Sequence, residues 1–354
     1  TPDRGARPGR PAGRAFVRSF RIGGIGLRVD TRVLGLGVSG LLLVLLVGAW
    51  GMTLGKVVIP VDAVIRSVAG MGPRETDFIV LTLRFPRVLT AALIGAMLGM
   101  AGGIFQGLVR NPLVSPDVIG INAGAGLAAV AWIVTGQNQA YLPAVAFAGA
   151  VLAAAAVYVL SWTGHLAGSR LVLVGIGVNA LLAAATTFLI VRYPIDRVSS
   201  AVLWQAGTVY GADWNDVRLL GIVLAVLAPV AIGLMWSLRV LQLGDTTART
   251  LGLPLERTRL ALAVVGCALC ATAVSIGGTI GFVAFLVPHL ARMLAGPMTG
   301  GVMLLTAVLG ALLLLGADLV GQHALPVALP VGVVTAALGA PFFLFLLYRT
   351  NARL

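Results

Sequence analysis

Long apolar segments without charged residues recur along the whole chain and constrain its fold more than any other feature. A helix needs about 20 predominantly apolar residues to cross the hydrocarbon core of a bilayer. Segments of about this size lie at roughly 33–54, 88–109, 118–135, 140–164, 171–191, 219–238, 260–288, 302–317 and 324–348. Such a pattern is typical of a polytopic membrane protein in which nearly every segment is a helix.

The segment that begins at residue 260 is too long for one span, because its apolar character continues to about residue 296. Gly277 and Gly278 interrupt it, and paired glycines favour a turn. We therefore predict two helices, 260–276 and 280–295. The sequence then predicts an all-α fold with about ten transmembrane helices, in which 118–135 and 302–317 are the shortest spans.

The composition agrees with a surface that faces lipid. Only 10% of the 354 residues are charged and 59% are hydrophobic, with a mean hydropathy of +1.01. Soluble domains carry about a quarter charged residues. We predict three parts: a tail over 1–32, a transmembrane domain over 33–349 and a short cytoplasmic tail over 350–354.

The tail carries eight of the 25 basic residues, although it has no hydrophobic periodicity. Its arginines are Arg4, Arg7, Arg10, Arg14, Arg18, Arg21, Arg28 and Arg32. Rich in Gly, Pro and Arg, it is predicted to be disordered. The positive-inside rule places it in the cytoplasm, and ten spans then place the C-terminus there too. Without the tail, 9 basic residues would lie on the cytoplasmic side and 8 on the other side, so they do not determine the orientation. Binding of nucleic acid or of specific lipids is the alternative role for these arginines.

The span over 88–109 carries glycines at every fourth position: Gly95, Gly99, Gly103 and Gly107. Small residues at this spacing form a smooth groove that lets helix backbones approach closely in a membrane. Two interpretations remain open. The groove is a packing surface, or it lines a conduit beside the polar Gln106.

Several kinds of chemistry have no candidate residues. A phosphate-binding loop needs a lysine after its glycines, and the single lysine, Lys56, follows no such pattern. Cys267 and Cys270 lie in an apolar helix without a second pair at metal spacing, so we interpret them as packing residues. Ion-coupled transporters place a carboxylate within the membrane. The nearest candidate, Asp318, falls at the end of a predicted span, which argues against ion-coupled transport.

Three polar stretches interrupt the apolar pattern. The first, LRFPR over 83–87, brings Arg84 and Arg87 to a membrane surface, as snorkelling side chains or as a docking site for carboxylates. The second, over 106–117, is a proline-stiffened loop. The third, over 243–254, predicts a short exposed amphipathic helix with Ala248, Leu251 and Leu253 on its apolar face, ended by a glycine. Such a helix suits either the groove of a protein partner or the lipid interface.

These stretches also carry a resemblance. The motifs LRFPRVL (83–89), QGLVRNPLVSPDVIG (106–120), ARTLGL (248–253), GGTIGFVAFLVPHLAR (277–292), ADLV (317–320) and LPVGVVTAALGAPFF (329–343) follow one another in the order typical of FecCD-type iron-chelate permeases. The chain resembles this family over about residues 80–348. The resemblance implies the type II fold of ATP-binding-cassette (ABC) importer permeases.

The resemblance also implies partners and a function. Two permease subunits, identical or paralogous, would enclose a central pathway, and two ATPase subunits and a substrate-binding protein would complete the importer. The expected substrate is a ferric siderophore, with haem or cobalamin as the alternative. The permease itself is expected to be no enzyme and to bind no cofactor or metal, while the partner ATPase uses ATP and Mg. A self-sufficient secondary transporter or channel and a structural scaffold are the rival classes. No nucleic-acid partner is expected.

Residue by residue, the resemblance places binding-protein docking at Arg84 and Arg87. It places the cytoplasmic gate or pathway at Gln106, Asn111 and Leu113. The ATPase-coupling segment, about 240–258, includes Gly244, Asp245, Ala248, Leu251, Gly252 and Leu253. The chain departs from the family pattern at Gln322, where relatives often carry a further external arginine, at the second gating loop over 166–170, and at Ala284.

Overall fold

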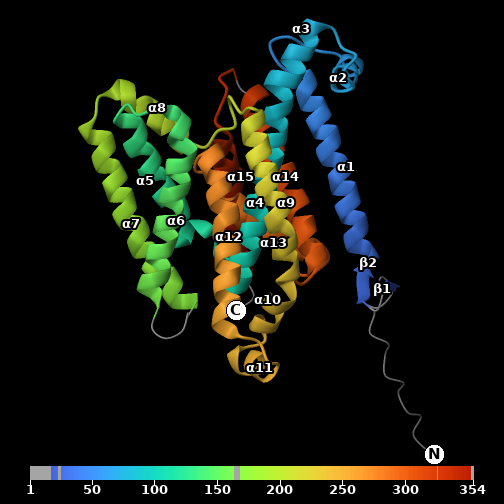
Figure 1. The fold of residues 1–354 in the computed structure, drawn as a ribbon, viewed down its shortest axis with the longest axis vertical. Helices are drawn as coiled ribbons and strands as arrows, with labels where there is room; N and C mark the ends of the chain where they lie inside the picture. Colours follow the sequence, from blue (N-terminus) through green and yellow to red (C-terminus); the bar gives the residue numbers. More distant parts are fainter. Residues whose placement is uncertain (1–16, 23–24, 163–167, 325, 352–354) are drawn as a thin grey trace, which may run out of the picture.

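The computed structural model describes residues 17–22, 25–162, 168–324 and 326–351, and most of them are helical (Figure 1). Among the residues described, seven helical segments are long and apolar enough to cross a membrane: α1 (Thr31–Thr53), the run Arg74–Val109 that ends in α4 (Phe85–Val109), Gln139–Ser161 with α6 (Leu142–Ser161), α7 (Gly168–Arg192), α9 (Trp214–Gly233), α12 (Leu255–Gly277) and α14 (Gly300–His323). Three shorter apolar segments are α5 (Ile121–Val134), α13 (Val283–Ala295) and the part Val331–Phe345 of α15 (Val331–Asn351). Together they account for the ten predicted spans.

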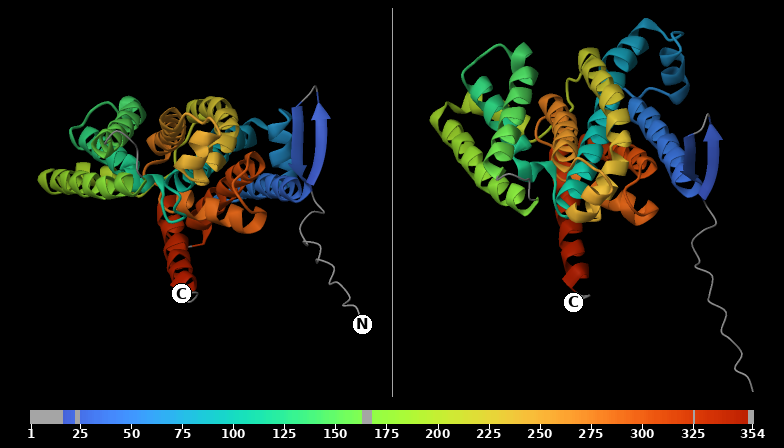
Figure 2. Two further views of the ribbon diagram at one scale, coloured as in Figure 1. Left: turned by 90° about the horizontal axis from the view of Figure 1, so that it is seen from below. Right: turned by 60° about the horizontal axis from the view of Figure 1, so that its bottom comes forward.

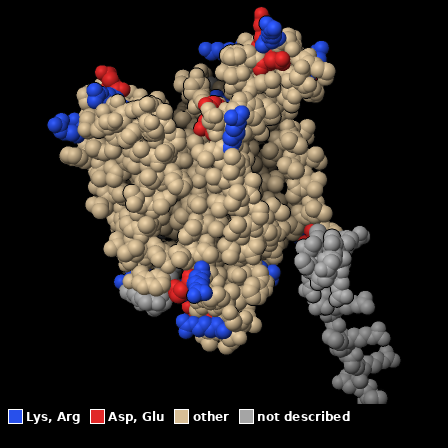
Figure 3. Space-filling model, in the orientation of Figure 1, with Lys and Arg blue, Asp and Glu red and all other residues tan. Residues whose placement is uncertain are grey.

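Short helices lie at the two ends of the bundle. α2 (Val61–Val68), α3 (Arg74–Asp77), the π-helical turn η1 (Phe78–Arg84), η3 (Gln139–Tyr141) and α8 (Ile195–Gln205) lie at one end, which we call the α3 end. η2 (Pro116–Ile119), α10 (Met235–Gln242) and α11 (Asp245–Thr250) lie toward the other, which we call the α11 end. Figure 3 shows Lys, Arg, Asp and Glu gathered at these two ends, with an uncharged belt between them. That distribution is the one expected of a protein that spans a bilayer.

α4 is the central helix of the bundle. It lies among α9, α12, α13 and α14 and contacts each of them (Figure 2). Its buried residues extend along nearly its whole length. A Cβ atom built on Gly95 would lie 2.1 Å from the carbonyl oxygen of Gly310 on α14, and one on Gly102 would lie 1.8 Å from that of Ala284. The small residues therefore permit backbone contact between helices. Neighbouring helices fill the glycine groove, which supports its interpretation as a packing surface.

A second group of helices, α5 to α8, lies to one side of α4 and α12 (Figure 1). α5 and α6 approach each other closely at Gly124 and Gly149, where a Cβ on either residue would meet the carbonyl oxygen of the other. α7 is largely exposed on the far side of this group. α1 lies at the opposite edge of the molecule, against α14.

The predicted break in the long apolar segment is confirmed. α12 ends at Gly277, and Gly278 follows with a φ of 71°, a backbone conformation that favours glycine. A Cβ at Gly278 would lie 2.2 Å from the carbonyl oxygen of Trp204. Because the chain crosses a neighbouring segment so closely here, a larger residue would not fit. α13 then begins at Val283, three residues later than predicted.

The prediction that residues 1–32 form a disordered tail is wrong for part of that range. β1 (Val17–Ile22) and β2 (Ile25–Asp30) pair antiparallel, with Ile22 opposite Ile25, and α1 begins at Thr31. The sequence carries a signal for this hairpin, since Ile25, Leu27 and Val29 alternate with other residues and Gly23-Gly24 separates the two runs. The high arginine content of residues 1–32 had instead predicted disorder. Residues 1–16 lie outside the described part of the chain.

Candidate functional site: polar networks at the two ends of the bundle

Arg84, at the end of η1, binds the backbone that follows α1. Its guanidinium donates hydrogen bonds to the carbonyl oxygens of Met52 (2.7 Å) and Val57 (2.6 Å). These acceptors lie at the C-terminal end of α1 and in the loop after it, where helix carbonyls lack partners. Arg84 therefore holds the loop between α1 and α2 against the start of α4.

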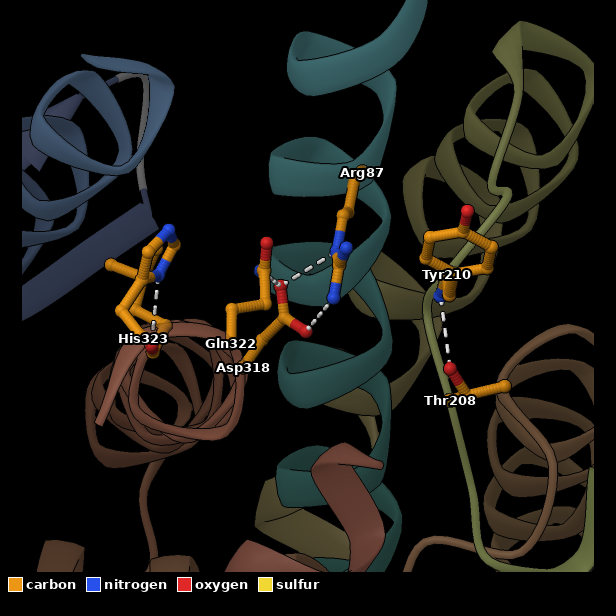
Figure 4. A network of polar contacts seen from close by, with 7 residues as sticks. Arg87, Thr208, Tyr210, Asp318, Gln322 and His323 are labelled. Carbon is orange, nitrogen blue, oxygen red and sulfur yellow. Dashed lines mark hydrogen bonds and ion pairs between the residues drawn. The ribbon is translucent and has the colours of Figure 1, made fainter. Parts of the chain in front are cut away.

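Arg87, one turn further along, forms a bidentate ion pair with Asp318 of α14 (Figure 4). Its Nε and Nη2 atoms lie 3.0 and 2.7 Å from the two carboxylate oxygens. Gln322 donates a further hydrogen bond to Asp318 (2.6 Å), and the Arg87 guanidinium lies 5.6 Å from the ring centre of Tyr210. We call these four residues the Arg87 network. Asp318 is 3% exposed and Arg87 is 19% exposed, so this pair is largely removed from water.

The structure corrects the position predicted for Asp318. α14 extends to His323, so Asp318 lies inside this helix rather than at its end. The helix is longer than the apolar pattern predicted because the carboxylate is neutralised by Arg87 of the neighbouring helix. A buried carboxylate is tolerated where it is paired and hydrogen-bonded. The pair joins α4 to α14 at the α3 end.

At the α11 end, Asp245 connects three elements. Its carboxylate binds Arg110, directly after α4 (2.6 Å), and Arg259 of α12 (2.7 Å). Arg259 also binds Glu256 (3.1 Å). We call these residues the Asp245 network. Burial alone would raise the pKa of Asp245, but the hydrogen bonds and charges of Arg259 and Arg110 outweigh it and lower that pKa.

Arg110 adopts an unusual backbone conformation within this network. It caps α4 with a φ of 56°, in the left-handed region that L-residues other than Asn and Asp rarely enter. The next residue, Asn111, donates its backbone N–H to the carbonyl oxygen of Gln106, which closes the helix end. The ion pair with Asp245 thus fixes the side chain of a residue whose backbone is already strained. No pattern in the sequence predicts this pairing.

A short helix lies where the sequence predicted one, but it differs from the prediction in which residues it exposes. α11 runs from Asp245 to Thr250 and is followed by Gly252 with a φ of 78°. Ala248 and Leu253 are buried in the bundle core, while Leu251 is 56% exposed. The predicted apolar face of Ala248, Leu251 and Leu253 is therefore wrong, because two of its members pack inward. Gly244 precedes the helix with a φ of 108°, and the exposed apolar side chains here are Leu243 and Leu251.

The loop between α4 and α5 contains the other predicted gate residues. The Asn111 side chain accepts a hydrogen bond from the backbone N–H of Leu113 (2.9 Å), and Leu113 is exposed. Gln106 is buried instead, where it donates to the carbonyl oxygen of Phe285 (2.9 Å) and accepts from Arg292 of α13 (2.5 Å). In this structure Gln106 joins two packed helices. Of the second predicted gating loop, Leu166 and Ala167 lie outside the described residues.

Asp117, in η2, was not predicted as a site residue. Burial raises its pKa to about 6, which a hydrogen bond from Ser115 partly opposes. The Asn179 side chain of α7 donates a hydrogen bond to the backbone carbonyl oxygen of Asp117 (2.7 Å). This carboxyl group therefore lies where the α4–α5 loop meets α7.

The position of Asp117 predicts a pH dependence of stability. A carboxyl whose folded-state pKa is raised stabilises the fold fully below its unfolded pKa, near 4, and that contribution is lost as pH rises through about 6. The rise of the Asp117 pKa from 3.8 to about 6 corresponds to ~3 kcal/mol in the free energy of unfolding. We expect Asp117→Asn to unfold at a higher temperature than the unmodified protein at pH 7.5, with a difference that shrinks at pH 5. Thermal unfolding in detergent at both values measures this, and equal pH slopes for the two proteins would contradict it.

A helical bundle with an uncharged belt between two charged ends is typical of a polytopic membrane protein. The chain belongs to the FecCD transport family, whose model matches residues 41–349. It is 40% identical over 341 residues to the achromobactin transport system permease protein CbrC of Dickeya dadantii, covering 95% of this chain and 98% of that protein. It is 38% identical over 308 residues to the ferric enterobactin transport system permease protein FepG of Escherichia coli, covering 86% and 93%.

The fold has a solved counterpart. A structure described as an inward-facing conformation of a metal-chelate type ABC transporter matches with a TM-score of 0.80 and 26% sequence identity. The match covers 91% of this chain and all of that one. The predicted family and the predicted permease fold are both confirmed.

Proposed function

We propose that this permease carries a ferric siderophore across the cytoplasmic membrane as part of an ABC importer. The observation that carries the proposal is the similarity, over nearly the whole length of both chains, to a permease named for achromobactin, together with the one named for ferric enterobactin. Two permease subunits would enclose the pathway. α7, which is exposed along most of its length, and the exposed residues of α15 offer surfaces for the second subunit.

The α11 end is proposed to face the cytoplasm and to receive the ATPase. Leu243 and Leu251 expose apolar side chains beside α11, and such side chains suit a groove on a partner protein. Through Arg110 and Arg259, Asp245 connects this segment to α4 and α12. A displacement of α11 by the ATPase would therefore be transmitted to the central helix. ATP and Mg would be used by the partner chain.

Asn111 and Leu113 are proposed to lie at the cytoplasmic gate. They directly follow Arg110, so the same displacement of α11 would move them. Leu113 is exposed, and its loop is held by Asn111 on one side and, through Asp117, by Asn179 of α7 on the other. The gate would open when these contacts shift together.

The rim at the α3 end is proposed to dock the binding protein through Arg84 and Arg87. Both guanidiniums already have partners within the chain, so a docking carboxylate would add to these contacts. Removing Arg87 alone would leave the buried Asp318 unpaired, which typically costs ~3–5 kcal/mol. A docking test must therefore remove both members of this pair.

We expect Arg84→Gln, and separately the double variant Arg87→Gln/Asp318→Asn, to weaken docking of the binding protein by about tenfold or more, since interfacial charges commonly contribute 2–5 kcal/mol. Affinity measured with the permease in lipid nanodiscs gives the result. Arg218→Gln, an exposed arginine at the same end, is the matched control. Unchanged affinity in both test variants would exclude the rim as the docking site.

Reconstituted uptake tests the proposed function itself. Proteoliposomes that contain the permease, its ATPase and its binding protein are expected to accumulate a labelled ferric siderophore only when ATP is supplied to the ATPase. A panel that also contains haem and cobalamin separates the alternative substrates. Uptake without any ATPase subunit would exclude an ABC importer and favour a secondary transporter.

A further inference from the structure

α2 and the residues beside it expose a continuous set of apolar side chains at the α3 end. Val58, Ile65 and Met71 are 76%, 62% and 71% exposed. Val57, Val61 and Val68 are also exposed. So many exposed apolar side chains around one eight-residue helix indicate a contact surface.

The side chains of α2 divide into three faces. Val61, Ile65 and Val68 follow the spacing i, i+4, i+7 and so share one face of the helix. Val64 and Ser67 are buried and face the bundle. Asp62 and Arg66 form an ion pair on the third side. The apolar face is therefore directed away from both the protein core and the charged side.

Val64 fixes how α2 sits against the protein. It packs in a small core with Met52 at the end of α1, Ile59 and Val80 of η1. Figure 1 shows α2 nearly end-on, whereas α1 and α4 run up the page, so α2 lies across the direction of the spans. Because Val64 and Ser67 hold one flank of α2 against the bundle, the face formed by Val61, Ile65 and Val68 is left exposed.

The surroundings of α2 indicate which partner covers this face. α2 lies just beyond the end of α1, at the outer edge of the molecule (Figure 1), and α1 exposes apolar side chains, including Trp50, along most of its length. The exposed apolar set on α2 thus follows directly on a span that itself exposes apolar side chains. The same segment carries Lys56, Arg66 and Arg74 together with Asp62, Glu75 and Asp77, and Figure 3 shows basic and acidic residues side by side at this end of the molecule. Charged side chains beside an apolar helix face are the pattern of a segment that lies at the boundary between lipid and water.

We infer that α2, with its flanking residues 57–71, is an interfacial helix whose apolar face is seated in the lipid surface on the α3 side of the membrane. Helices that lie in this plane have an apolar face toward the acyl chains and a charged face toward water. The lipid contact would hold the loop after α1 in place, and Arg84 binds this same loop through the carbonyl oxygen of Val57. The inference requires only that the protein spans a membrane, and it is independent of substrate.

Spin labels at two positions test the inference. Cys267 and Cys270 are first replaced by alanine, and a single cysteine is introduced as Ile65→Cys or as Asp62→Cys. The two positions are matched, because Ile65 is 62% exposed and the Asp62 side chain is 65% exposed in the protein alone. The labelled permease is placed in nanodiscs of phosphatidylethanolamine and phosphatidylglycerol, and gel filtration verifies that each variant is folded.

We expect the label at position 65 to collide several-fold more often with oxygen, which concentrates in lipid, than with a water-soluble nickel chelate. The label at position 62 should show the reverse preference. Access of the nickel chelate to position 65 equal to that at position 62 would overturn the inference. The inference would also be overturned if the nickel chelate reached position 65 freely and lost this access only when the binding protein was added. That result would make the face a protein-docking surface.

Discussion

Replacing Gly310 with alanine is expected to destabilise the protein strongly, whereas the same replacement at Gly316, in the same helix, is expected to cost little. A Cβ at Gly310 would lie 2.1 Å from the carbonyl oxygen of Gly95 on α4, and the opposing atom belongs to the backbone. Relief of the clash therefore requires α4 and α14 to move apart. Added methyl groups in a packed core typically cost ~1–3 kcal/mol, and we expect the upper end of that range or more.

Gly316 provides the matched control, because a Cβ there would meet nothing within 4 Å. Alanine is a better helix former than glycine by up to ~1 kcal/mol, so Gly316→Ala should be neutral or slightly stabilising. Thermal unfolding of the purified permease, with gel filtration to detect misfolded protein, measures the difference. Equal unfolding temperatures for the two variants would show that the contact between α4 and α14 is not as close as the structure gives.

Asp245→Asn is expected to separate ATP hydrolysis from transport. The substitution removes the charge that joins Arg110 to Arg259 but keeps the size of the side chain. The side chains of Asp245 and Arg110 are 41% and 40% exposed, so the fold should lose little stability. The three elements would then no longer be joined through one carboxylate, and we expect uptake per ATP hydrolysed to fall by about tenfold, which corresponds to ~1.4 kcal/mol of coupling free energy. Reconstituted importer in proteoliposomes gives both rates.

Two further variants make this result specific. Asp245→Glu keeps the charge and should restore part of the coupling. Arg257→Gln removes an exposed cation of the same region for which the described residues provide no ion pair, and it should leave coupling unchanged. If Asp245→Asn transports normally, α11 does not act through Arg110 and Arg259. If it loses ATPase binding as well, the residue acts in docking of the ATPase.

Much of the fold could be predicted because membrane spans are encoded locally. The ten segments and the break at Gly277-Gly278 follow from apolar length and from the turn preference of glycine. The glycines of α4 likewise indicated a close contact between helices, although the sequence could not show that Gly95 contacts Gly310. The hairpin at 17–30 was not predicted, because a high content of Arg and Gly is typical of disordered segments, whereas the alternation of apolar residues here is short.

The candidate sites were predicted less completely. Arg84 and Arg87 were expected as free cations of the rim, yet each has partners within the chain, and Asp318 is separated from Arg87 by 231 positions. Ala248 and Leu253 were assigned to an exposed face, but they pack into the core. Asp117 and Arg292 were missed, because neither burial nor a hydrogen bond to a distant helix can be read from the residue type.

By itself the sequence determined that this chain is a membrane protein of about ten helices and, through its ordered motifs, to which family it belongs. Transfer of apolar segments into lipid is a property of each segment, so it needs no knowledge of neighbours. Tertiary structure alone decided that Arg87 pairs with Asp318, that Asp245 connects α11 to α4 and α12, and that α2 turns an apolar face outward. These features depend on which helices lie side by side, and packing between distant segments sets that arrangement.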